Sequence, residues 1–329
     1  MKILLVQHRA IGDVIMCTPA IRALKRAIPK SEITFLVSDY AFDVLRYNPH
    51  IDRYLVPPKN VSNFKYMGYL YKVKKNRYDI VIDFQNNPRS ALVTFISCAK
   101  KRISFDSKHR NYAYNIQIQP PAIHVYAAIR KLMLLQPLGI EEMMDVVPDF
   151  YIAGADREWA DQLWKKLEFS KEDLVIVVSP VSGGRKFYRQ WDPEHYGRLC
   201  DFLISKYNAK ILFNWGPGEY RILKSVLEQM KNRIEIDYEI SNIRYLKAVL
   251  EKSSLYIGCD GGARHMAVAA DIPTIGLYHN SRISSHWTPP GDPKHVIILP
   301  EKVGIKNIQL ETVIEITDTI VGSISEKIH

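Results

Sequence analysis

The chain has 329 residues, of which 47% are hydrophobic and 24% charged, a balance that is typical of soluble globular proteins and excludes disordered and fibrous classes. Its formal net charge is +10, and the whole excess lies in residues 1–150, which hold 22 Lys and Arg against 12 Asp and Glu. Residues 151–329 carry 23 charged groups of each sign. This asymmetry favours two domains whose partners differ in charge; a cationic face kept only for solubility is the alternative.

The sequence gives no sign of membrane insertion or of disulfide bonding. Charged residues or prolines interrupt every apolar run before it reaches the roughly 18 residues that span a bilayer. The first residues, MKILLVQH, lack the basic region of a signal peptide. The four cysteines are far apart and show no CxxC spacing. We therefore expect a cytoplasmic protein without a disulfide framework or a metal site.

Segments with the character of buried strands alternate with segments of helical periodicity along the chain. In the first half, strands are predicted at 2–7, 32–38, 79–84 and 102–106, and helices at 11–28, 41–48, 64–78 and 90–99. In the second half, strands are predicted at 174–180, 209–215, 255–260 and 273–278, and helices at 158–167, 192–207, 219–230, 263–271 and 307–328. Asp192 is the expected N-cap of its helix, with Pro193 in the first turn. The alternation predicts two doubly wound α/β domains with parallel sheets and a boundary near residues 150–160.

The loop His8–Asp13 follows the first predicted strand, and in open α/β sheets ligands bind outside the carboxyl ends of the strands. Asp13 is either a helix N-cap or a functional carboxylate, and Gly12 permits a sharp turn or a close backbone approach. His8 is a competing general base, because an unperturbed imidazole titrates near neutrality. The loop is not a dinucleotide-binding fingerprint, since GxGxxG is absent.

The loop after predicted strand 255–260 has the composition of a phosphate site. Gly261 and Gly262 let the backbone approach a ligand, and the free N–H groups of the following helix favour an anion. Tight packing explains paired glycines equally well. Asp260 either orients the loop or binds a sugar hydroxyl, and His265, on the first helical turn, is typical of a packed or capping imidazole.

Two further loops of the second half carry charged side chains. Ser179 opens a glycine-rich loop in which Lys186 and Arg189 are suited to contact a diphosphate. Glu219 follows strand 209–215 and either accepts hydrogen bonds from a ribose or stabilises its own helix through the dipole. The phosphate- and sugar-directed loops thus lie in the neutral half, whereas the Asp13 loop and the basic excess lie in the other half. This division predicts a nucleotide-type donor on the second domain and an anionic acceptor on the first.

Six motifs stand in order along the chain. They are Ile11-Gly12-Asp13, Thr18-Pro19-Ala20-Ile21-Arg22-Ala23-Leu24, Asp83-Phe84-Gln85, Arg189-Gln190-Trp191-Asp192-Pro193, Trp215-Gly216 with Glu219, and Ile257-Gly258-Cys259-Asp260-Gly261-Gly262 with His265. Together they resemble the motifs of the heptosyltransferases of glycosyltransferase family 9. The resemblance implies a GT-B fold, with two Rossmann-like domains facing each other across a cleft. It assigns an acceptor-binding domain to 1–155, a donor-binding domain to 156–306, and a helix that crosses back to the first domain to 307–329.

The resemblance also implies an activity. The family transfers a heptose from a nucleotide sugar, usually ADP-heptose, to the lipopolysaccharide inner core, with inversion and with neither a metal nor a cofactor. Asp13 would be the general base. The residues implied in donor binding are Ser179, Lys186, Arg189, Glu219, Asp260, Gly261, Gly262 and His265. Those implied in acceptor binding are Arg9, Gly12, Gln85 and Arg89.

Two departures from the family pattern leave the donor open. Gly261 stands where the family usually has Thr or Ser, and Arg189 stands where it has Lys. The alternative is therefore a family member with a different nucleotide sugar or a non-lipopolysaccharide acceptor. An oxidoreductase or epimerase is disfavoured because GxGxxG and a Tyr-x-x-x-Lys proton relay are missing. No known nucleic-acid motif accompanies the basic charge, so no nucleic-acid partner is expected.

The basic excess is concentrated in residues 59–110, which hold 12 basic and 3 acidic residues. Within it, aromatic and basic residues interleave over 64–78, on what we interpret as one amphipathic helix. This composition suits the surface of an anionic membrane or a phosphorylated lipid acceptor, and predicts a peripheral protein at the inner face of the membrane. The alternative is that the aromatic residues pack on the core and the lysines are merely solvated.

Overall fold

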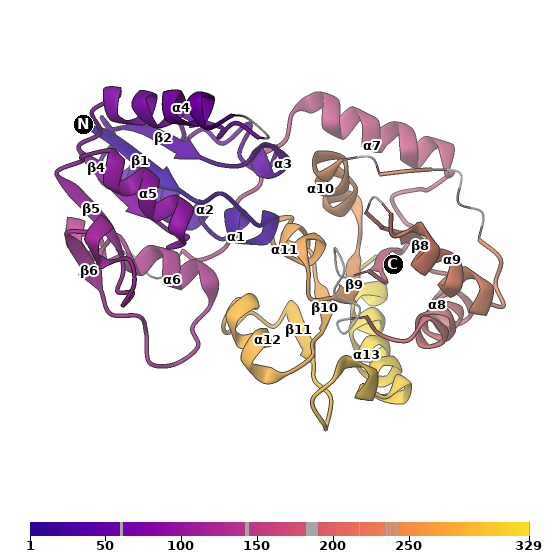
Figure 1. Ribbon diagram of the computed structural model, residues 1–329. Helices are drawn as coiled ribbons and strands as arrows, with labels where there is room; N and C mark the ends of the chain where they lie inside the picture. The colour runs from indigo at the N-terminus through magenta and orange to yellow at the C-terminus, as the bar shows by residue number, and fades with distance from the viewer. Residues whose placement is uncertain are drawn as a thin grey trace. The chain divides into compact units, whose positions relative to one another are not determined.

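The computed structural model describes residues 1–59, 62–141, 145–181, 190–216, 218–234, 236, 238–240 and 242–328. The chain divides into two compact units, Met1–Tyr151 and Ile152–His329, each built on its own parallel sheet (Figure 1). None of the described helices combines the length and the apolar character that a membrane span requires.

The first unit contains a six-stranded parallel sheet in the order β3-β2-β1-β4-β5-β6. Its strands are β1 (Lys2–Val6), β2 (Glu32–Leu36), β3 (Arg53–Leu55), β4 (Ile80–Asp83), β5 (Lys101–Phe105) and β6 (Ile116–Ile118). Its helices are α1 (Ile11–Ile15), α2 (Thr18–Ala27), α3 (Asp39–Phe42), α4 (Asn63–Lys75), α5 (Pro88–Ile96) and α6 (Ala127–Met133), with 3₁₀ turns at Asn111–Ala113 and Gln136–Leu138. This strand order is that of a Rossmann domain.

Helices α4 and α5 cover one face of this sheet, and the residues of β1 show why. Leu4 and Val6 join a buried cluster with Val73 of α4 and Val93 of α5. Leu5 lies between them in β1 and therefore points to the opposite face, yet it is equally buried. Both faces of the sheet are thus covered, as expected of a parallel sheet with near-continuous apolar strands.

The prediction of one helix over 11–28 is wrong, because the structure divides this segment into α1 and α2. The break falls just before Thr18 and Pro19. Pro19 has no N–H to donate, and its ring clashes with the carbonyl four residues earlier, that of Ile15. The Thr18 hydroxyl donates to this same carbonyl at 2.7 Å. The short helix α1 therefore ends early and stays close to the carboxyl edge of the sheet.

The second unit contains a five-stranded parallel sheet in the order β11-β10-β9-β7-β8. Its strands are β7 (Val175–Ser179), β8 (Lys210–Phe213), β9 (Leu255–Cys259), β10 (Thr274–Leu277) and β11 (His295–Ile298). Its helices are α7 (Gly154–Lys166), α8 (Pro193–Tyr207), α9 (Tyr220–Gln229), α10 (Ile243–Lys252), α11 (Gly262–Ala269), α12 (Ser281–Trp287) and α13 (Leu310–Ile328), with a 3₁₀ turn at Ile305–Asn307. The first strand, β7, lies inside this sheet, which is the second common doubly wound order.

The predicted start of helix α8 is confirmed. The Asp192 carboxylate accepts a hydrogen bond from the Glu194 N–H at 2.9 Å, and Pro193 occupies the first helical position, where its missing N–H leaves no carbonyl unpaired. This cap fixes the point at which the chain enters the core after the segment 182–189.

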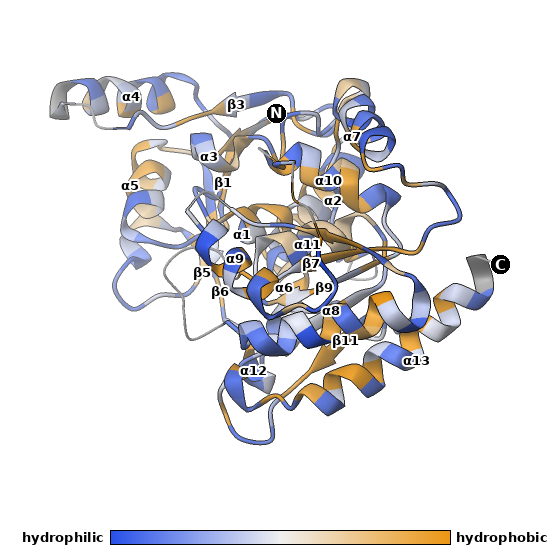
Figure 2. Cartoon of the chain, turned by 90° about the vertical axis from the view of Figure 1, so that its right-hand side faces the viewer, coloured by the Kyte–Doolittle hydropathy of each residue, from blue (hydrophilic) through white to orange (hydrophobic). Residues whose placement is uncertain are grey.

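Helix α13 belongs to the core of the second unit. Val313 and Val321 are fully buried in the same apolar cluster as the strands of this unit. Asp318 accepts hydrogen bonds from two side chains of α8, and Figure 2 shows apolar and polar residues alternating along the helix. The indole N–H of Trp191 donates to the Ile308 carbonyl at 2.9 Å and secures the approach to α13. The predicted return of this helix to the first domain stays a prediction.

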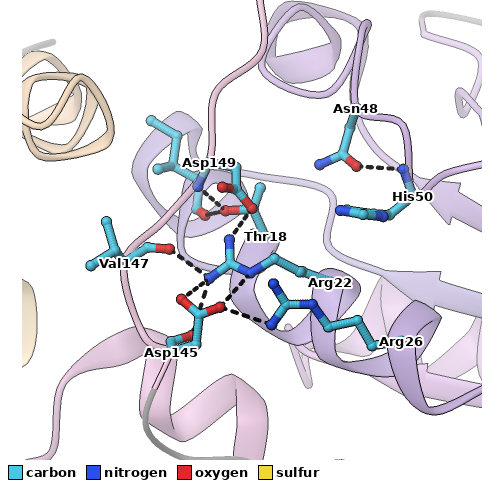
Figure 3. A network of polar contacts seen from close by, with 9 residues as sticks. Thr18, Arg22, Arg26, Asn48, His50, Asp145, Val147 and Asp149 are labelled. Carbon is cyan, nitrogen blue, oxygen red and sulfur yellow. Dashed lines mark hydrogen bonds and ion pairs between the residues drawn. The ribbon is translucent and has the colours of Figure 1, made fainter.

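An ion-pair network around the buried Arg22 fixes the last part of the first unit to α2 (Figure 3). Arg22, which is only 7% exposed, forms ion pairs with both Asp145 and Asp149, and its Nη2 lies 2.5 Å from Asp145 Oδ1. Arg26 reaches the same Asp145 at 3.0 Å, and the Thr18 hydroxyl accepts the Asp149 N–H at 2.8 Å. Burial raises the pKa of Asp149, and the charge of Arg22 opposes that rise. The arginine of the Thr18–Leu24 motif therefore has a structural role.

Candidate functional site

Each sheet has one point at which the direction of strand addition reverses, and open α/β folds bind ligands at such points, outside the carboxyl ends of the strands. In the first unit this point lies between β1 and β4, where Val6 pairs with Asp83. In the second unit it lies between β7 and β9, where Ser179 pairs with Gly258. The loops that follow these four strands carry most of the residues that the sequence predicts to bind or react.

In the first unit, Gln85 joins the loop after β4 to the loop after β1. Its side-chain oxygen accepts the backbone N–H of His8 at 2.6 Å, and its side-chain nitrogen donates to the Arg9 carbonyl at 3.2 Å. Gln7 donates to the same Arg9 carbonyl at 2.6 Å. The structure thus brings together Gln85 and Arg9, two of the predicted acceptor residues, through the backbone of the β1 loop.

Lys131 stabilises the contact between the β1 loop and the β4 loop, and the sequence analysis did not predict a role for this residue. Its ammonium group is buried and donates to the Gln7 side-chain oxygen at 2.9 Å and to the Phe84 carbonyl at 2.8 Å. Asp83, also buried, accepts the Tyr114 hydroxyl at 2.7 Å. The available signal was a single lysine in the apolar run KLMLL, which is a rare place for a charge without a partner.

Asp13 lies in the first turn of α1, half-buried, at the edge of this junction. Its carboxylate accepts the Ala10 N–H, the N-cap N–H of α1, at 3.3 Å. Burial raises the pKa of the nearby Tyr40; the charge of Arg9 lowers it and that of Asp13 raises it further. Gly12 lies inside α1, and the interpretation of a sharp turn there is wrong. Asp13 thus caps its own helix loosely and remains accessible.

His8 is a weaker candidate base than its residue type suggests. Burial lowers its pKa to about 4, against a hydrogen bond with Gln85 that raises it, while Arg89 and Arg9 lower it further. The Gln85 amide is oriented by its bond to Arg9, so its oxygen faces His8 Nδ1 at 3.2 Å and that nitrogen carries the proton. His8 is therefore neutral at pH 7, and its low proton affinity makes it a weak base. Arg89 is exposed at the start of α5.

In the second unit, Ser179 ends β7 in a closely packed environment. Its hydroxyl accepts a hydrogen bond from the Asn214 side chain at 3.3 Å, and its side chain is almost fully buried. A Cβ atom on Gly258, its neighbour in β9, would come within 2.8 Å of the Ser179 carbonyl oxygen and 2.7 Å of the Tyr256 hydroxyl. Glycine at 258 is therefore required for the strands to pack at this edge.

The loop after β9 forms the start of α11. Gly261 is the N-cap residue, with extended backbone, and its position offers no side chain to cap the helix. Among the described residues, the first-turn N–H groups of α11 therefore have no capping side chain, as at helix starts that bind anions. Asp260 is buried and its N–H donates to the Leu277 carbonyl at 3.2 Å. The loop is thus anchored to β10 on one side and has open donors on the other.

His265 is a packed imidazole in this structure. It is 3% exposed, lies against the Trp287 ring with centroids 4.9 Å apart, and its Nδ1 has no hydrogen-bond partner among the described residues. Burial lowers its pKa to about 3, and the charges of Arg264 and His286 lower it further. It is therefore neutral under all ordinary conditions.

Glu219 is the N-cap residue of α9, and only half of its carboxylate is satisfied. One oxygen accepts the Gly216 N–H at 2.8 Å, which is the packing role expected of a residue at a helix start. The other oxygen is buried and has no hydrogen-bond partner in the part of the chain that the structure describes. An unsatisfied buried carboxylate oxygen is an acceptor for a ligand hydroxyl.

Lys186 and Arg189 lie outside the described residues, so their contact with a diphosphate stays a prediction. Among the residues that are described, no group of three or more His, Cys, Asp or Glu is arranged to hold a metal ion.

Comparison with known proteins identifies one family to which the chain is similar. The profile of "Glycosyltransferase family 9 (heptosyltransferase)" matches residues 69–311. The chain is 24% identical over 285 residues to lipopolysaccharide heptosyltransferase 3 of Escherichia coli K12, covering 81% of this chain and 79% of that relative.

Solved structures are similar over nearly the full length. A glycosyl transferase of family 9 from Veillonella parvula has a TM-score of 0.87 and 20% identity, covering 98% of this chain and 97% of that one. The E. coli heptosyltransferase WaaC with ADP has a TM-score of 0.72 and 20% identity, covering 99% and 100%. These likenesses confirm the expected fold class, GT-B with two Rossmann-like domains.

Proposed function

The chain belongs to glycosyltransferase family 9, the heptosyltransferases, and on this premise we propose that it transfers a heptose from ADP-heptose to a lipopolysaccharide inner-core acceptor with inversion. The expectation that the protein is a glycosyltransferase is confirmed by the family match. The donor, the acceptor and the roles of individual residues are proposals. These proposals rest on one observation. At the carboxyl edge of the second sheet, the first N–H groups of α11 and one buried oxygen of Glu219 have no side-chain partner among the described residues.

That edge suits a nucleoside diphosphate. The uncapped N–H groups of α11 at Gly261 and Gly262 offer donors to the phosphates, and the helix dipole adds to their attraction for an anion. The unsatisfied oxygen of Glu219 offers an acceptor to a ribose hydroxyl. Asp260, Ser179 and His265 line or support the same edge. The similarity to a heptosyltransferase with ADP supports ADP as the nucleotide.

Asp13 is the proposed general base. Its carboxylate takes the proton from the acceptor hydroxyl as that oxygen attacks the anomeric carbon of the heptose. The bond from that carbon to the diphosphate oxygen breaks on the opposite face, and the electron pair leaves with ADP. The N–H groups of α11, with Lys186 or Arg189, stabilise the charge that develops on the leaving phosphate, so the reaction needs no metal. Attack from the face opposite the leaving group inverts the anomeric carbon.

Gln85, Arg9, Gly12 and Arg89 form the proposed acceptor side. Gln85 fixes the β1 loop through its bonds to the backbone of His8 and Arg9, which leaves the two exposed arginines free to meet anionic groups. A guanidinium binds carboxylates and phosphates with paired hydrogen bonds. An acidic, phosphorylated inner-core sugar suits this arrangement.

The experiment that tests this function is a donor panel with the purified full-length chain. ADP-heptose, GDP-heptose, ADP-glucose and UDP-glucose are supplied with a truncated inner-core lipopolysaccharide, and release of the nucleoside diphosphate is followed. We expect turnover with ADP-heptose to exceed that with every other donor by at least about tenfold, which corresponds to about 1.4 kcal/mol of discrimination. Faster turnover with another donor favours the alternative, which Gly261 in place of the usual Thr or Ser motivates.

A second part of the proposal is peripheral binding to an anionic membrane on the cytoplasmic side. The structure divides the large apolar and aromatic residues of α4 between two faces: Tyr69 packs in the core, as the alternative interpretation expects, whereas Met67 and Tyr71 are 59% and 65% exposed. Lys72 and Lys75 are exposed beside them. Exposed apolar side chains among lysines are the composition of a helix that lies on an anionic surface.

The same surface continues onto α5. A shallow pocket of about 320 Å³ is lined by Lys74, Phe95, Ile96, Cys98 and Arg102. It combines two cationic side chains with apolar walls, which suits the headgroup region of an anionic lipid.

Vesicle sedimentation tests the membrane contact. Reversal of Lys72, Lys74 and Lys75 to Glu is expected to abolish binding to anionic vesicles, because each basic residue near such a surface contributes about 1 kcal/mol. The matched control reverses Lys165, Lys171 and Lys302, which are exposed in the second unit, and is expected to bind as the parent chain does. Equal sedimentation with neutral and anionic vesicles would leave only the solvated-face explanation.

A further inference from the structure

Arg264 is a fully buried arginine in the first turn of α11, two residues after Gly262. Its Nη1 donates to the Tyr278 hydroxyl at 2.7 Å and to the Trp287 carbonyl at 3.3 Å. Its guanidinium carbon lies 5.2 Å from the centroid of the Tyr278 ring. The side chain therefore runs from α11 across to the end of β10.

This guanidinium forms no ion pair with the part of the chain that the structure describes. Its Nε and Nη2 have no hydrogen-bond partner among the same residues. A buried cation without a carboxylate costs several kcal/mol of stability in general, and proteins rarely retain one without a use. Its two hydrogen bonds both come from Nη1 and leave the other two guanidinium nitrogens without an acceptor among the described residues.

The neighbouring sequence makes room for this cation. A Cβ atom on Gly276, in the middle of β10, would lie 2.4 Å from the Arg264 Nε and 3.0 Å from its Cδ. Any other residue at position 276 would displace the guanidinium. The absence of a side chain at Gly276 is thus coupled to the presence of a large one at Arg264.

The location of the Arg264 guanidinium relative to the carboxyl edge of the second sheet determines whether its charge can act on a ligand bound there. Tyr278 directly follows β10, at the carboxyl edge of the sheet, and Leu277 accepts the backbone N–H of Asp260 from the β9 loop. Arg264 itself lies about 3 Å along the helix axis from Gly262, at 1.5 Å per residue. The guanidinium lies against Gly276 and the Tyr278 hydroxyl, on the strand whose Leu277 carbonyl holds the Asp260 loop.

The charge of Arg264 contributes to the lowered pKa values of two histidines of the second unit. Burial lowers the pKa of His265 to about 3 and that of His295 to about 4, and in each case Arg264 is the next largest cause and lowers the pKa further. The charge thus reaches side chains on two elements of this unit, one of them on α11 itself.

We propose that Arg264 is a positioning residue for the donor diphosphate: held in the first turn of α11 without an ion pair to any described residue, it supplies a permanent positive field at the start of this helix without touching the ligand. This inference rests on the proposed function, since it assigns the buried charge to the nucleoside diphosphate of the donor. The diphosphate is the counter-charge that the described residues do not provide. The field reinforces the helix dipole, and it stabilises the leaving ADP more than the donor because ADP carries the additional charge.

The test compares the affinities of ADP, AMP and adenosine, measured by calorimetry on the full-length chain. The charged ligands sense the field and adenosine does not. Arg264→Met keeps most of the volume and removes the charge. We expect it to weaken ADP binding by about tenfold, the effect of one charge acting through a protein interior, and to leave adenosine binding within about twofold. Arg264→Lys is expected to retain the preference for ADP.

Stability separates this role from a structural one. Removal of an unpaired buried charge is expected to leave the melting temperature of Arg264→Met unchanged or higher. A structural anchor predicts the reverse, namely a lower melting temperature and an equal loss of affinity for all three ligands, and this result would overturn the proposal. If Arg264→Met does not fold, Arg264→Gln, which keeps a donor for Tyr278, gives the same comparison.

The parent chain tests the premise separately. If it binds ADP no more tightly than adenosine, the proposed donor site is wrong and the role of Arg264 falls with it. If it prefers ADP and Arg264→Met prefers it equally, the donor site stands and only the inference about Arg264 is wrong. Tyr278→Phe removes a hydrogen bond but no charge, and is expected to keep the ADP preference of the parent chain.

Discussion

The polar groups at the two sheet edges differ in how they are satisfied. At the β1–β4 edge of the first unit, the side chains hydrogen-bond one another: Lys131 donates to Gln7, and Gln85 holds the loop backbone. At the carboxyl edge of the second unit, atoms of Glu219, Arg264 and His265 are buried without hydrogen-bond partners among the described residues. The side chains named at the first edge satisfy one another, whereas the three named at the second edge have buried atoms without hydrogen-bond partners among the described residues.

This difference indicates two ways of building a site. A self-satisfied network fixes geometry, which suits a site that must place one carboxylate against an acceptor hydroxyl. Unsatisfied buried groups cost stability until a ligand completes them, which suits a site whose task is to hold a nucleotide. In the proposed function, the basic excess of the first half attracts an anionic acceptor over a longer range, and the neutral second half binds the donor through local groups.

The largest expected effect removes the carboxylate that the first edge presents. Asp13→Ala is expected to lower kcat by about 10²–10⁴-fold with a smaller change in donor affinity, the range for the loss of a general base. Steady-state kinetics with saturating acceptor measure it.

Asp13→Asn is the matched control, because Asn caps a helix as well as Asp does. If Asp13 serves only its bond to the Ala10 N–H, the Asn variant keeps full activity. Full activity would return the role of base to His8, and the pH profile of kcat/KM would then follow a group with a pKa of about 4.

The next prediction contrasts the two buried cations. Lys131→Met leaves the Gln7 and Phe84 oxygens without donors, and is expected to lower the free energy of unfolding by about 2–3 kcal/mol. Arg264→Met also removes the donor to the Tyr278 hydroxyl and the Trp287 carbonyl, but it removes two buried guanidinium nitrogens that have no partner among the described residues, so a smaller loss or none is expected. Denaturant titration of both variants measures the difference. Equal destabilisation would mean that the two edges are built alike.

Acid tests the buried histidines of the second unit. The pKa values of His265 and His295 in the folded chain, about 3 and about 4, lie below the usual 6.5. Between pH 6.5 and 4 the unfolded chain therefore binds more protons, so stability falls as the pH falls through this range. At pH 5 each histidine is expected to remove about 2 kcal/mol of the free energy of unfolding. His265→Gln is expected to flatten the profile, and a profile with unchanged slope contradicts the assignment.

The smallest effect concerns the half-satisfied carboxylate. Glu219→Ala is expected to raise the donor KM by about tenfold and to change kcat by less than about threefold, because a ribose contact is present in both the ground state and the transition state. Initial rates at varied donor concentration measure both constants. An unchanged donor KM would limit Glu219 to its bond with the Gly216 N–H.

The sequence predicted the buried parallel strands well, because runs such as KILLV and VIVVS are apolar throughout. It missed β3, β6 and β11, whose three or four residues give too short an apolar run at a sheet edge. It extended one helix through Thr18-Pro19, although Pro19 was visible, and it extended a helix over 41–48, where the structure ends α3 at Phe42.

The candidate site shows the same limit. Asp13, Gln85 and Asp260 follow strands, and their location at the carboxyl edges was predictable from the alternation of elements. The contacts of Gln85 with the β1 loop, and the lack of an ion pair between Arg264 and any described residue, depend on side chains far apart in the sequence. No local pattern encodes them, because they arise only once the strands are ordered in the sheet.

The place of α13 in the second core has a consequence for how the chain is made. Val313 and Val321 are fully buried, and the Ile308 carbonyl accepts the indole N–H of Trp191 from more than a hundred residues earlier. During synthesis the first unit has all its strands once Tyr151 has emerged from the ribosome, so it can fold while translation continues. The second unit must wait until α13 has been translated before its apolar cluster closes. Until then the strands of the second unit expose apolar surface to solvent. The time during which α13 is translated is therefore when chaperones have the most apolar surface to protect.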